Sequence, residues 1–83
     1  DDFHALFAEL PPSVQTVARR AYEVWSENPY HPGLDFKCVN RREQMYSVRI
    51  GIHYRALGRR AGDCISWYWI GSHAEYDELL RRS

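Results

Sequence analysis

Two arginines that face each other across a predicted β-hairpin are the residues whose types and spacing most directly suggest chemistry. Residues 45–50 and 54–59 alternate like strands, and Gly51-Ile52-His53 separates them. A three-residue loop places Arg49 opposite Arg55. Because like charges in cross-strand positions repel each other, we interpret the pair as a site for an anion between them. A two-residue loop would send the two side chains to opposite faces, so this hypothesis depends on the register.

His73 is a candidate for proton transfer because it lies at a predicted helix start. Ser72 and Glu75 have the spacing of a capping box, which begins a helix just after Gly71. Free backbone N–H groups at such a start attract phosphate. The same partial positive charge favours a neutral imidazole that can accept a proton. The alternative is an ordinary solvated histidine.

Lys37 and Tyr76 complete the set of candidate site residues. Lys37 follows Phe36 in a strand-like segment, from which its ammonium could reach an anion held by the neighbouring strand. Tyr76 lies one helical turn after His73, where it can orient the imidazole or pack in the core. A solvated lysine and a packing tyrosine are the alternatives.

The charge distribution favours a local anion-binding surface. The chain has 11 basic and 11 acidic residues and therefore no net charge. Residues 37–60, however, hold seven basic side chains and one acid, whereas the rest of the chain holds four arginines and ten acids. Such a basic segment is typical of a phosphate-binding surface, and an ordinary solvated face is the alternative.

Composition excludes several classes of protein. The 83 residues predict one domain, residues 1–83. No apolar run approaches the ~20 residues of a membrane span, we find no secretory leader, and 14% aromatic residues argue against disorder. Cys38 and Cys64 form no CxxC motif, which is typical of reduced structural thiols in the cytoplasm. The four histidines lack metal-ligand spacing, so we expect no metal and no other cofactor.

Two helices are predicted before the basic segment. Apolar residues at helical spacing indicate a short helix over residues 3–10, which Pro11-Pro12 ends. Ser13 can cap a second helix, whose apolar stripe runs over residues 14–25 and which ends at Asn28-Pro29. The two stripes suggest an antiparallel helical hairpin that must cover a sheet.

Four strand-like segments follow, over residues 34–39, 45–50, 54–59 and 64–70. The last segment is apolar on both sides, so we expect it in the centre of the sheet. Its predicted faces are Ile65, Trp67 and Trp69 on one side and Ser66, Tyr68 and Ile70 on the other. The predicted fold class is α+β, with an N-terminal helical hairpin packed on an antiparallel sheet of about four strands and a short C-terminal helix.

The order of these elements and several short strings resemble one family. Residues 11–80 are similar to the RelE/ParE superfamily toxins of bacterial type II toxin–antitoxin systems, and most similar to their RelE and HigB members. The strings that carry the resemblance are Leu34-Asp35-Phe36-Lys37, Tyr46-Ser47-Val48-Arg49, Tyr54-Arg55-Ala56-Leu57-Gly58 and Trp69-Ile70-Gly71-Ser72-His73-Ala74-Glu75-Tyr76-Asp77. The resemblance implies a curved sheet. It also implies either RelE-like and HigB-like cleavage of messenger RNA in the ribosomal A site or ParE-like inhibition of DNA gyrase.

The candidate residues match what RNA cleavage requires. Attack of a ribose 2′-hydroxyl on the adjacent phosphate needs a base, an acid and positive charge around the phosphorus. The resemblance matches Arg49 and Arg55 to phosphate-contacting residues and His73 to a functional histidine, without showing whether His73 is the base or the acid. Lys37 could also reach the phosphate, and Tyr76 could stack on a base. The sequence therefore predicts a metal-independent endoribonuclease that arrests translation.

This chain departs from the RelE pattern at two positions. RelE toxins have a lysine where this chain has Ser47 and an arginine where it has His73, which favours a HigB-like arrangement or reduced activity. A gyrase inhibitor without nuclease chemistry and a degenerate member that only binds an antitoxin are the alternatives.

The expected partners are a cognate antitoxin, messenger RNA and the ribosome, with operator DNA bound only through the antitoxin complex. The antitoxin could bind the acidic helical hairpin or cover the basic face.

Overall fold

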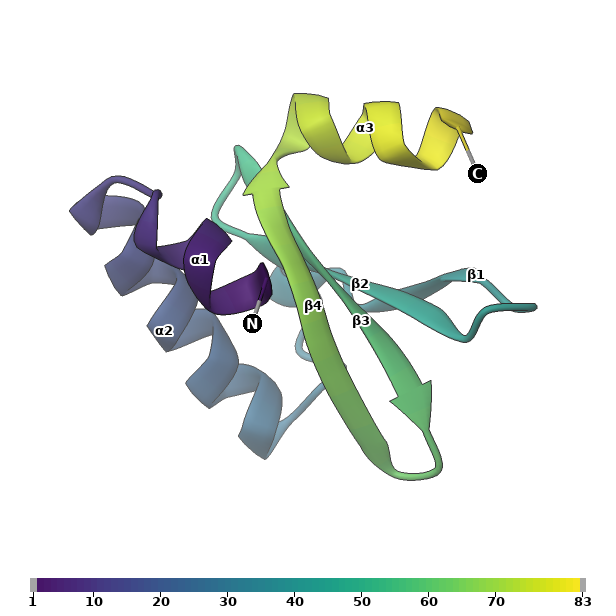
Figure 1. Cartoon of the computed structure of the whole chain (residues 1–83). Coiled ribbons are helices and arrows are strands. Elements are labelled where there is room, and N and C mark those ends of the chain that lie inside the picture. The colour runs from purple at the N-terminus through teal and green to yellow at the C-terminus, as the bar shows by residue number, and fades with distance from the viewer. Residues whose placement is uncertain (1, 83) are drawn as a thin grey trace.

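Three α-helices and one antiparallel sheet make up the computed structural model, which describes residues 2–82 (Figure 1). The helices are α1 (Asp2–Ala8), α2 (Pro12–Glu27) and α3 (His73–Arg82), with a 3-10 helix η1 (Pro32–Leu34). The strands are β1 (Lys37–Asn40), β2 (Met45–Ile50), β3 (Tyr54–Ala61) and β4 (Cys64–Ser72), and they lie side by side in chain order. The predicted α+β fold with a four-stranded sheet and a C-terminal helix is confirmed.

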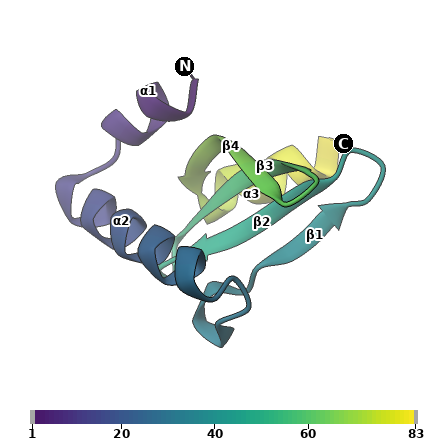
Figure 2. The ribbon, with the colours of Figure 1, turned by 90° about the horizontal axis from the view of Figure 1, so that it is seen from below.

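The N-terminal helices cover one face of the twisted sheet (Figure 2). Helix α1 packs on β4, and α2 packs on β2. Because side chains alternate along a strand, every second residue of β2 faces the helices, and the core forms from those residues together with one side of α2. Its fully buried members are Ala18, Leu34, Val48, Ile50, Ala56 and Ile70.

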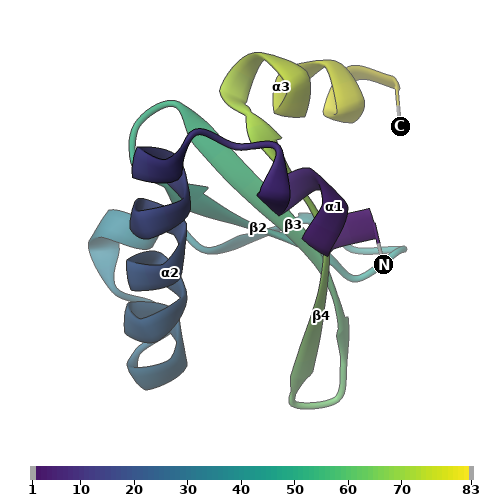
Figure 3. The same cartoon turned by 60° about the vertical axis from the view of Figure 1, so that its left-hand side comes forward.

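A groove of about 530 Å³ remains between α1, α2 and the sheet. Figure 3 shows the two helices on the same side of the sheet, with α1 crossing β4. Phe3 and Phe7 line the groove from α1, Ala21 and Trp25 line it from α2, and Trp67 lines it from β4. The two helices therefore pack on different strands and leave the groove between them open, in place of the predicted close hairpin.

Strand β4 corrects two predictions. It lies at the edge of the sheet and not in its centre, and its two apolar faces are explained by α1 on one side and α3 near the other. A β-bulge breaks its alternation, because Leu57 pairs with Trp69 while the next residue, Gly58, pairs with Trp67. Trp67 therefore packs in the helix-covered core, whereas Trp69 lies beside α3. The two tryptophans do not share a face as predicted.

Two element starts also differ from prediction. The segment predicted as a strand from residue 34 begins as η1, and β1 starts only at Lys37. Between them Asp35 has a positive φ of 46°, because it ends a helical turn begun by Pro32. Helix α2 begins at Pro12 without a side-chain cap, in place of the predicted Ser13 cap. Proline suits the first helical position because its fixed φ is already helical.

The β2–β3 hairpin has the predicted register. Ile50 pairs with Tyr54, and Arg49 pairs with Arg55. Gly51 supports the three-residue turn with a φ of 63°, a conformation that costs glycine little. Within residues 2–82, no helix is both long and apolar enough to cross a lipid bilayer.

Candidate functional site

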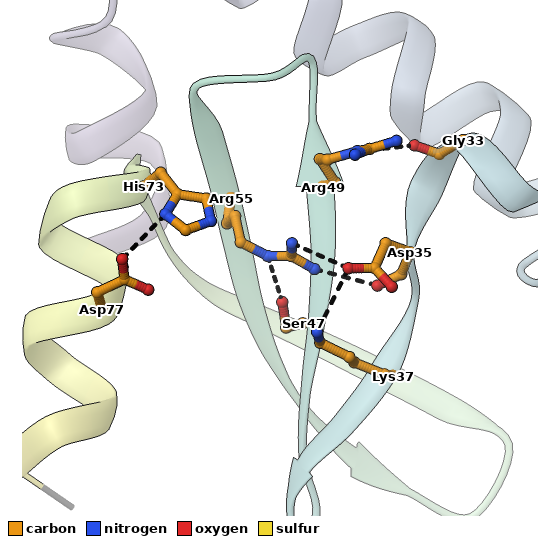
Figure 4. A network of polar contacts seen from close by, with 8 residues as sticks. All are labelled: Gly33, Asp35, Lys37, Ser47, Arg49, Arg55, His73 and Asp77. Carbon is orange, nitrogen blue, oxygen red and sulfur yellow. Dashed lines mark hydrogen bonds and ion pairs between the residues drawn. The ribbon is translucent and has the colours of Figure 1, made fainter.

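The predicted site residues gather on the face of the sheet that α2 does not cover. Ser47 and Arg49 alternate with the core residues of β2, so their side chains leave the opposite face. Arg55 is the cross-strand partner of Arg49 on β3. His73 begins α3 directly after β4. Figure 4 shows these side chains together with the segment that precedes β1.

Arg55 lies at the centre of this face and is buried, with only 4% of its side chain exposed. Its Nε donates a hydrogen bond to Oγ of Ser47 over 2.7 Å. Its two terminal nitrogens donate to Asp35, one to Oδ2 at 3.2 Å and the other to the backbone oxygen at 3.0 Å. The guanidinium also stacks 5.0 Å from the ring centroid of Tyr76. Arg55 thus connects β2, the segment before β1 and α3.

Asp35 is the anion of the site, and the sequence argument did not identify it. Its carboxylate bridges Arg55 and Lys37, whose Nζ lies 3.4 Å from Oδ2. Partial burial alone raises the pKa of the Asp35 carboxyl. Hydrogen bonds and positive charge from Arg55 and Lys37 outweigh that effect, so the pKa lies below the ordinary aspartate value. The contribution of this ion pair to stability is complete above the ordinary pKa, and it is lost as the pH falls through the lowered one.

Arg49 takes a different direction from Arg55. Its Nε donates a hydrogen bond to the backbone oxygen of Gly33 over 3.2 Å. Figure 4 shows the two guanidinium groups pointing to separate partners, although their strands pair as predicted. The repulsion between the arginines is relieved by the carboxylate of Asp35 and the carbonyl of Gly33. An external anion is therefore not needed to place the two arginines opposite each other.

The capping box that places His73 forms as predicted. Both backbone N–H and Oγ of Ser72 donate to Oε1 of Glu75, and the N–H of Glu75 donates to Oγ of Ser72. The N–H of His73 donates to the backbone oxygen of His53 over 2.7 Å. The N–H groups of His73 and Glu75 are therefore not free for a phosphate, because the chain itself supplies their acceptors.

The imidazole of His73 is exposed and oriented by its own helix. Nδ1 lies 3.1 Å from Oδ2 of Asp77, one turn further along α3. When Nδ1 carries the proton and donates a hydrogen bond to this carboxylate, Nε2 is left as an acceptor. Spacing i, i+4 places two side chains on the same side of a helix, so the pair His73 and Asp77 could have been found in the sequence.

Tyr76 connects the histidine to the buried arginine. It is 4% exposed, its ring lies 5.7 Å from the imidazole of His73, and Arg55 covers it. Packing and orientation of the imidazole, two of the roles considered for Tyr76, both fit this position. Lys37, Arg55, Tyr76 and His73 therefore form one connected group, while Arg49 lies to one side of it.

The structure offers no obvious metal site among the residues it describes. Within residues 2–82, no group of three histidine, cysteine or acidic side chains could hold a metal ion. Cys38 and Cys64 are both free and exposed. Each lies within a strand as predicted, at an exposed position of β1 or β4, so neither thiol packs in the core.

A family model identifies the kind of protein that carries this site. The model of the ParE-like toxin domain matches residues 12–78. The chain belongs to the ParE-like toxin domain family. This match spans the elements from α2 into α3 and includes every candidate residue described above. No curated protein and no solved structure matches the chain significantly.

Membership of the ParE-like toxin domain family confirms the predicted membership of the RelE/ParE superfamily. It makes the chain a toxin of a toxin–antitoxin system, and it implies a cognate antitoxin as partner. The family itself does not distinguish cleavage of RNA from inhibition of gyrase, so the choice between them depends on the chemistry of the site.

Proposed function

We propose that this toxin is a metal-independent endoribonuclease that cuts messenger RNA on the ribosome and so arrests translation. The single observation that carries the proposal is the exposed imidazole of His73, which is oriented by Asp77 and lies against Tyr76, the residue whose ring the Arg55 guanidinium covers. A surface that only docks onto another protein has no need for an imidazole held in one orientation.

The proposed reaction is an attack of the ribose 2′-oxygen on the adjacent phosphorus. The P–O bond to the 5′-oxygen breaks as the new bond forms, which leaves a 2′,3′-cyclic phosphate and a 5′-hydroxyl. The 2′-hydroxyl loses its proton, and the departing 5′-oxygen gains one. In this scheme Nε2 of His73 transfers one of these protons, and Lys37 and Arg49 stabilise the negative charge around the phosphorus.

The products of RNA cleavage test this proposal. The purified toxin, added to ribosomes that hold a messenger RNA in the A site, should cut within codons and leave 2′,3′-cyclic phosphate ends. The matched substrate carries a 2′-deoxyribose at the cut position and should stay intact, because it lacks the attacking oxygen. Cutting of the deoxy substrate, or no cutting of either substrate, would refute the proposed reaction.

Inhibition of DNA gyrase is the second candidate, and one observation favours it. Arg55 is held by the carboxylate of Asp35, so the site has one cation fewer for RNA than the sequence predicted. A gyrase inhibitor would arrest growth with DNA damage and uncut messages. A member that only binds its antitoxin would cause no arrest when it is expressed alone.

We propose that the cognate antitoxin binds the groove between α1 and α2 with an amphipathic segment. The groove is lined mainly by apolar side chains, and two of them, Trp25 and Trp67, have buried indole N–H groups without an acceptor among the described residues. Glu23 lines the groove together with Arg19, and Glu27 follows Glu23 at helical spacing outside the groove, so a basic residue of the segment would find an acidic partner on this side of α2. Of the two surfaces predicted for the antitoxin, this proposal favours the acidic hairpin.

A charge placed in this groove should weaken antitoxin binding without affecting RNA cleavage. We expect Ala21→Arg to lower the affinity for the antitoxin by at least about tenfold, because an unpaired guanidinium resists burial under a partner. Thr16→Arg is the matched control, since Thr16 is an exposed residue of α2 outside the groove. Calorimetric titration of both variants with the antitoxin measures the difference. Equal affinities would place the antitoxin elsewhere.

A further inference from the structure

Asp35 makes two ionic contacts of very different strength. Its contact with Arg55 comprises two hydrogen bonds, to the carboxylate and to the backbone oxygen, and the arginine is buried. Its contact with Lys37 is a single 3.4 Å approach between side chains that are 52% and 45% exposed. Exposed ion pairs contribute little to stability, whereas hydrogen-bonded pairs shielded from water are costly to break. An incoming anion should therefore displace Asp35 from Lys37 much more readily than from Arg55.

The remaining contacts of Arg55 point in the same direction. Its Nε is bound to Ser47, which is fully buried, and one face of its guanidinium lies on the ring of Tyr76. A phosphate that reached Arg55 would have to replace Asp35 and enter a region that the protein already fills. Lys37 has none of these restraints, and Figure 4 shows its side chain on the same face as that of Arg55.

We propose that Asp35 is an internal counter-anion that fixes Arg55 as a positioning residue and holds Lys37 until an RNA phosphate replaces its carboxylate. This inference rests on the proposed ribonuclease function and adds to it the carboxylate that an RNA phosphate must displace from Lys37. Asp35 holds the guanidinium of Arg55 against the ring of Tyr76. Because Tyr76 also contacts the imidazole of His73, Asp35 supports the position of His73 indirectly. At the same time its charge competes with RNA for Lys37, so that it weakens the binding of RNA.

Asp35→Asn tests the proposal because it removes the charge and keeps an acceptor. The amide oxygen can still accept from Arg55, and the backbone oxygen of residue 35 and Ser47 still hold the guanidinium. We expect the variant to bind a 2′-O-methyl RNA oligonucleotide, which cannot be cleaved, about three- to fivefold more tightly at low salt. The same gain should appear with inorganic pyrophosphate as the probe. Lys37→Gln should weaken binding and reduce the salt dependence by about one phosphate contact.

A double-mutant cycle separates the proposed exchange from a general effect of charge. In a Lys37→Gln background, Asp35→Asn should bring less than half of its gain in affinity. In an Arg49→Gln background, Asp35→Asn should give its full gain in affinity. A gain of equal size in both backgrounds would overturn the exchange at Lys37, and so would an Asp35→Asn variant that binds no better than the parent.

The two probes distinguish failure of this inference from failure of the proposed function. Pyrophosphate binding that follows the cycle, in a toxin that leaves RNA uncut, would refute the ribonuclease and retain the role of Asp35. RNA cleavage that depends on His73, with binding insensitive to Asp35→Asn, would refute the role of Asp35 alone. A parent protein that binds neither probe would refute both.

Discussion

Arg55→Ala should lower the free energy of unfolding by about 3 kcal/mol, the lower end of the range for breaking a buried ion pair. The lower end applies because Asp35 is partly exposed, so that water can solvate its carboxylate after the arginine is gone. Ser47 Oγ would also lose its partner in a fully buried position, and Tyr76 would lose the group that covers its ring. In a domain of this size the melting temperature should fall by roughly 12–24 °C. Urea unfolding followed by tryptophan fluorescence measures the change.

The matched control is another arginine on the same strand. Arg59 pairs with Glu43 at the surface, with 62% of its side chain exposed, and Arg59→Ala should cost less than about 1 kcal/mol. Arg55→Lys should lie between the two variants, because an ammonium can pair with Asp35 but cannot also reach Ser47 in the same way. If Arg55→Ala and Arg59→Ala unfold at the same urea concentration, the buried network does not stabilise the fold.

This outcome changes how loss of activity in an Arg55 variant is interpreted. The resemblance matches Arg55 to a phosphate-contacting residue, a role in which its loss would affect binding of RNA. In the structure its guanidinium is bound to Asp35, Ser47 and Tyr76. An inactive Arg55→Ala protein would therefore report a damaged scaffold as readily as a lost phosphate contact.

Local rules predicted the elements that local interactions decide. The capping box at Ser72 and Glu75 formed as expected, because its hydrogen bonds all lie within four residues of the chain. The register of the β2–β3 hairpin was also correct, since the three-residue turn determines which residues pair. These two features alone placed His73 and the pair of arginines on their elements.

Long-range packing decided what the sequence did not reveal. The bulge at Tyr68 turned Trp67 and Trp69 to different faces, and nothing in the alternating pattern of β4 indicates an extra residue. Asp35 and Arg55 are twenty residues apart in sequence. They meet because η1 packs on β2 and ends at Asp35. A strand pattern read from residue 34 conceals that turn.

His73→Ala should lower the rate of RNA cleavage about 10²- to 10⁴-fold, the usual contribution of a positioned acid or base. The fold should be retained, with a change in unfolding free energy within about 0.5 kcal/mol, because the imidazole is exposed and the backbone N–H of residue 73 keeps its bond to His53. Single-turnover cleavage of ribosome-bound message at several pH values measures the effect. The loss in cleavage rate should be greatest at the pH at which the parent cleaves fastest.

Two further variants make this result specific to the imidazole. His53→Ala removes a second exposed histidine from the neighbouring hairpin loop and should cleave like the parent, since the hydrogen bond from His73 goes to the backbone oxygen of residue 53, which the variant keeps. Asp77→Asn replaces the carboxylate that contacts Nδ1, so it should slow cleavage less than His73→Ala, because the imidazole itself is retained. If His73→Ala cuts ribosome-bound RNA at the parental rate, His73 does not transfer a proton in the reaction. If it still arrests growth while messages remain uncut, the toxin acts on gyrase and not on RNA.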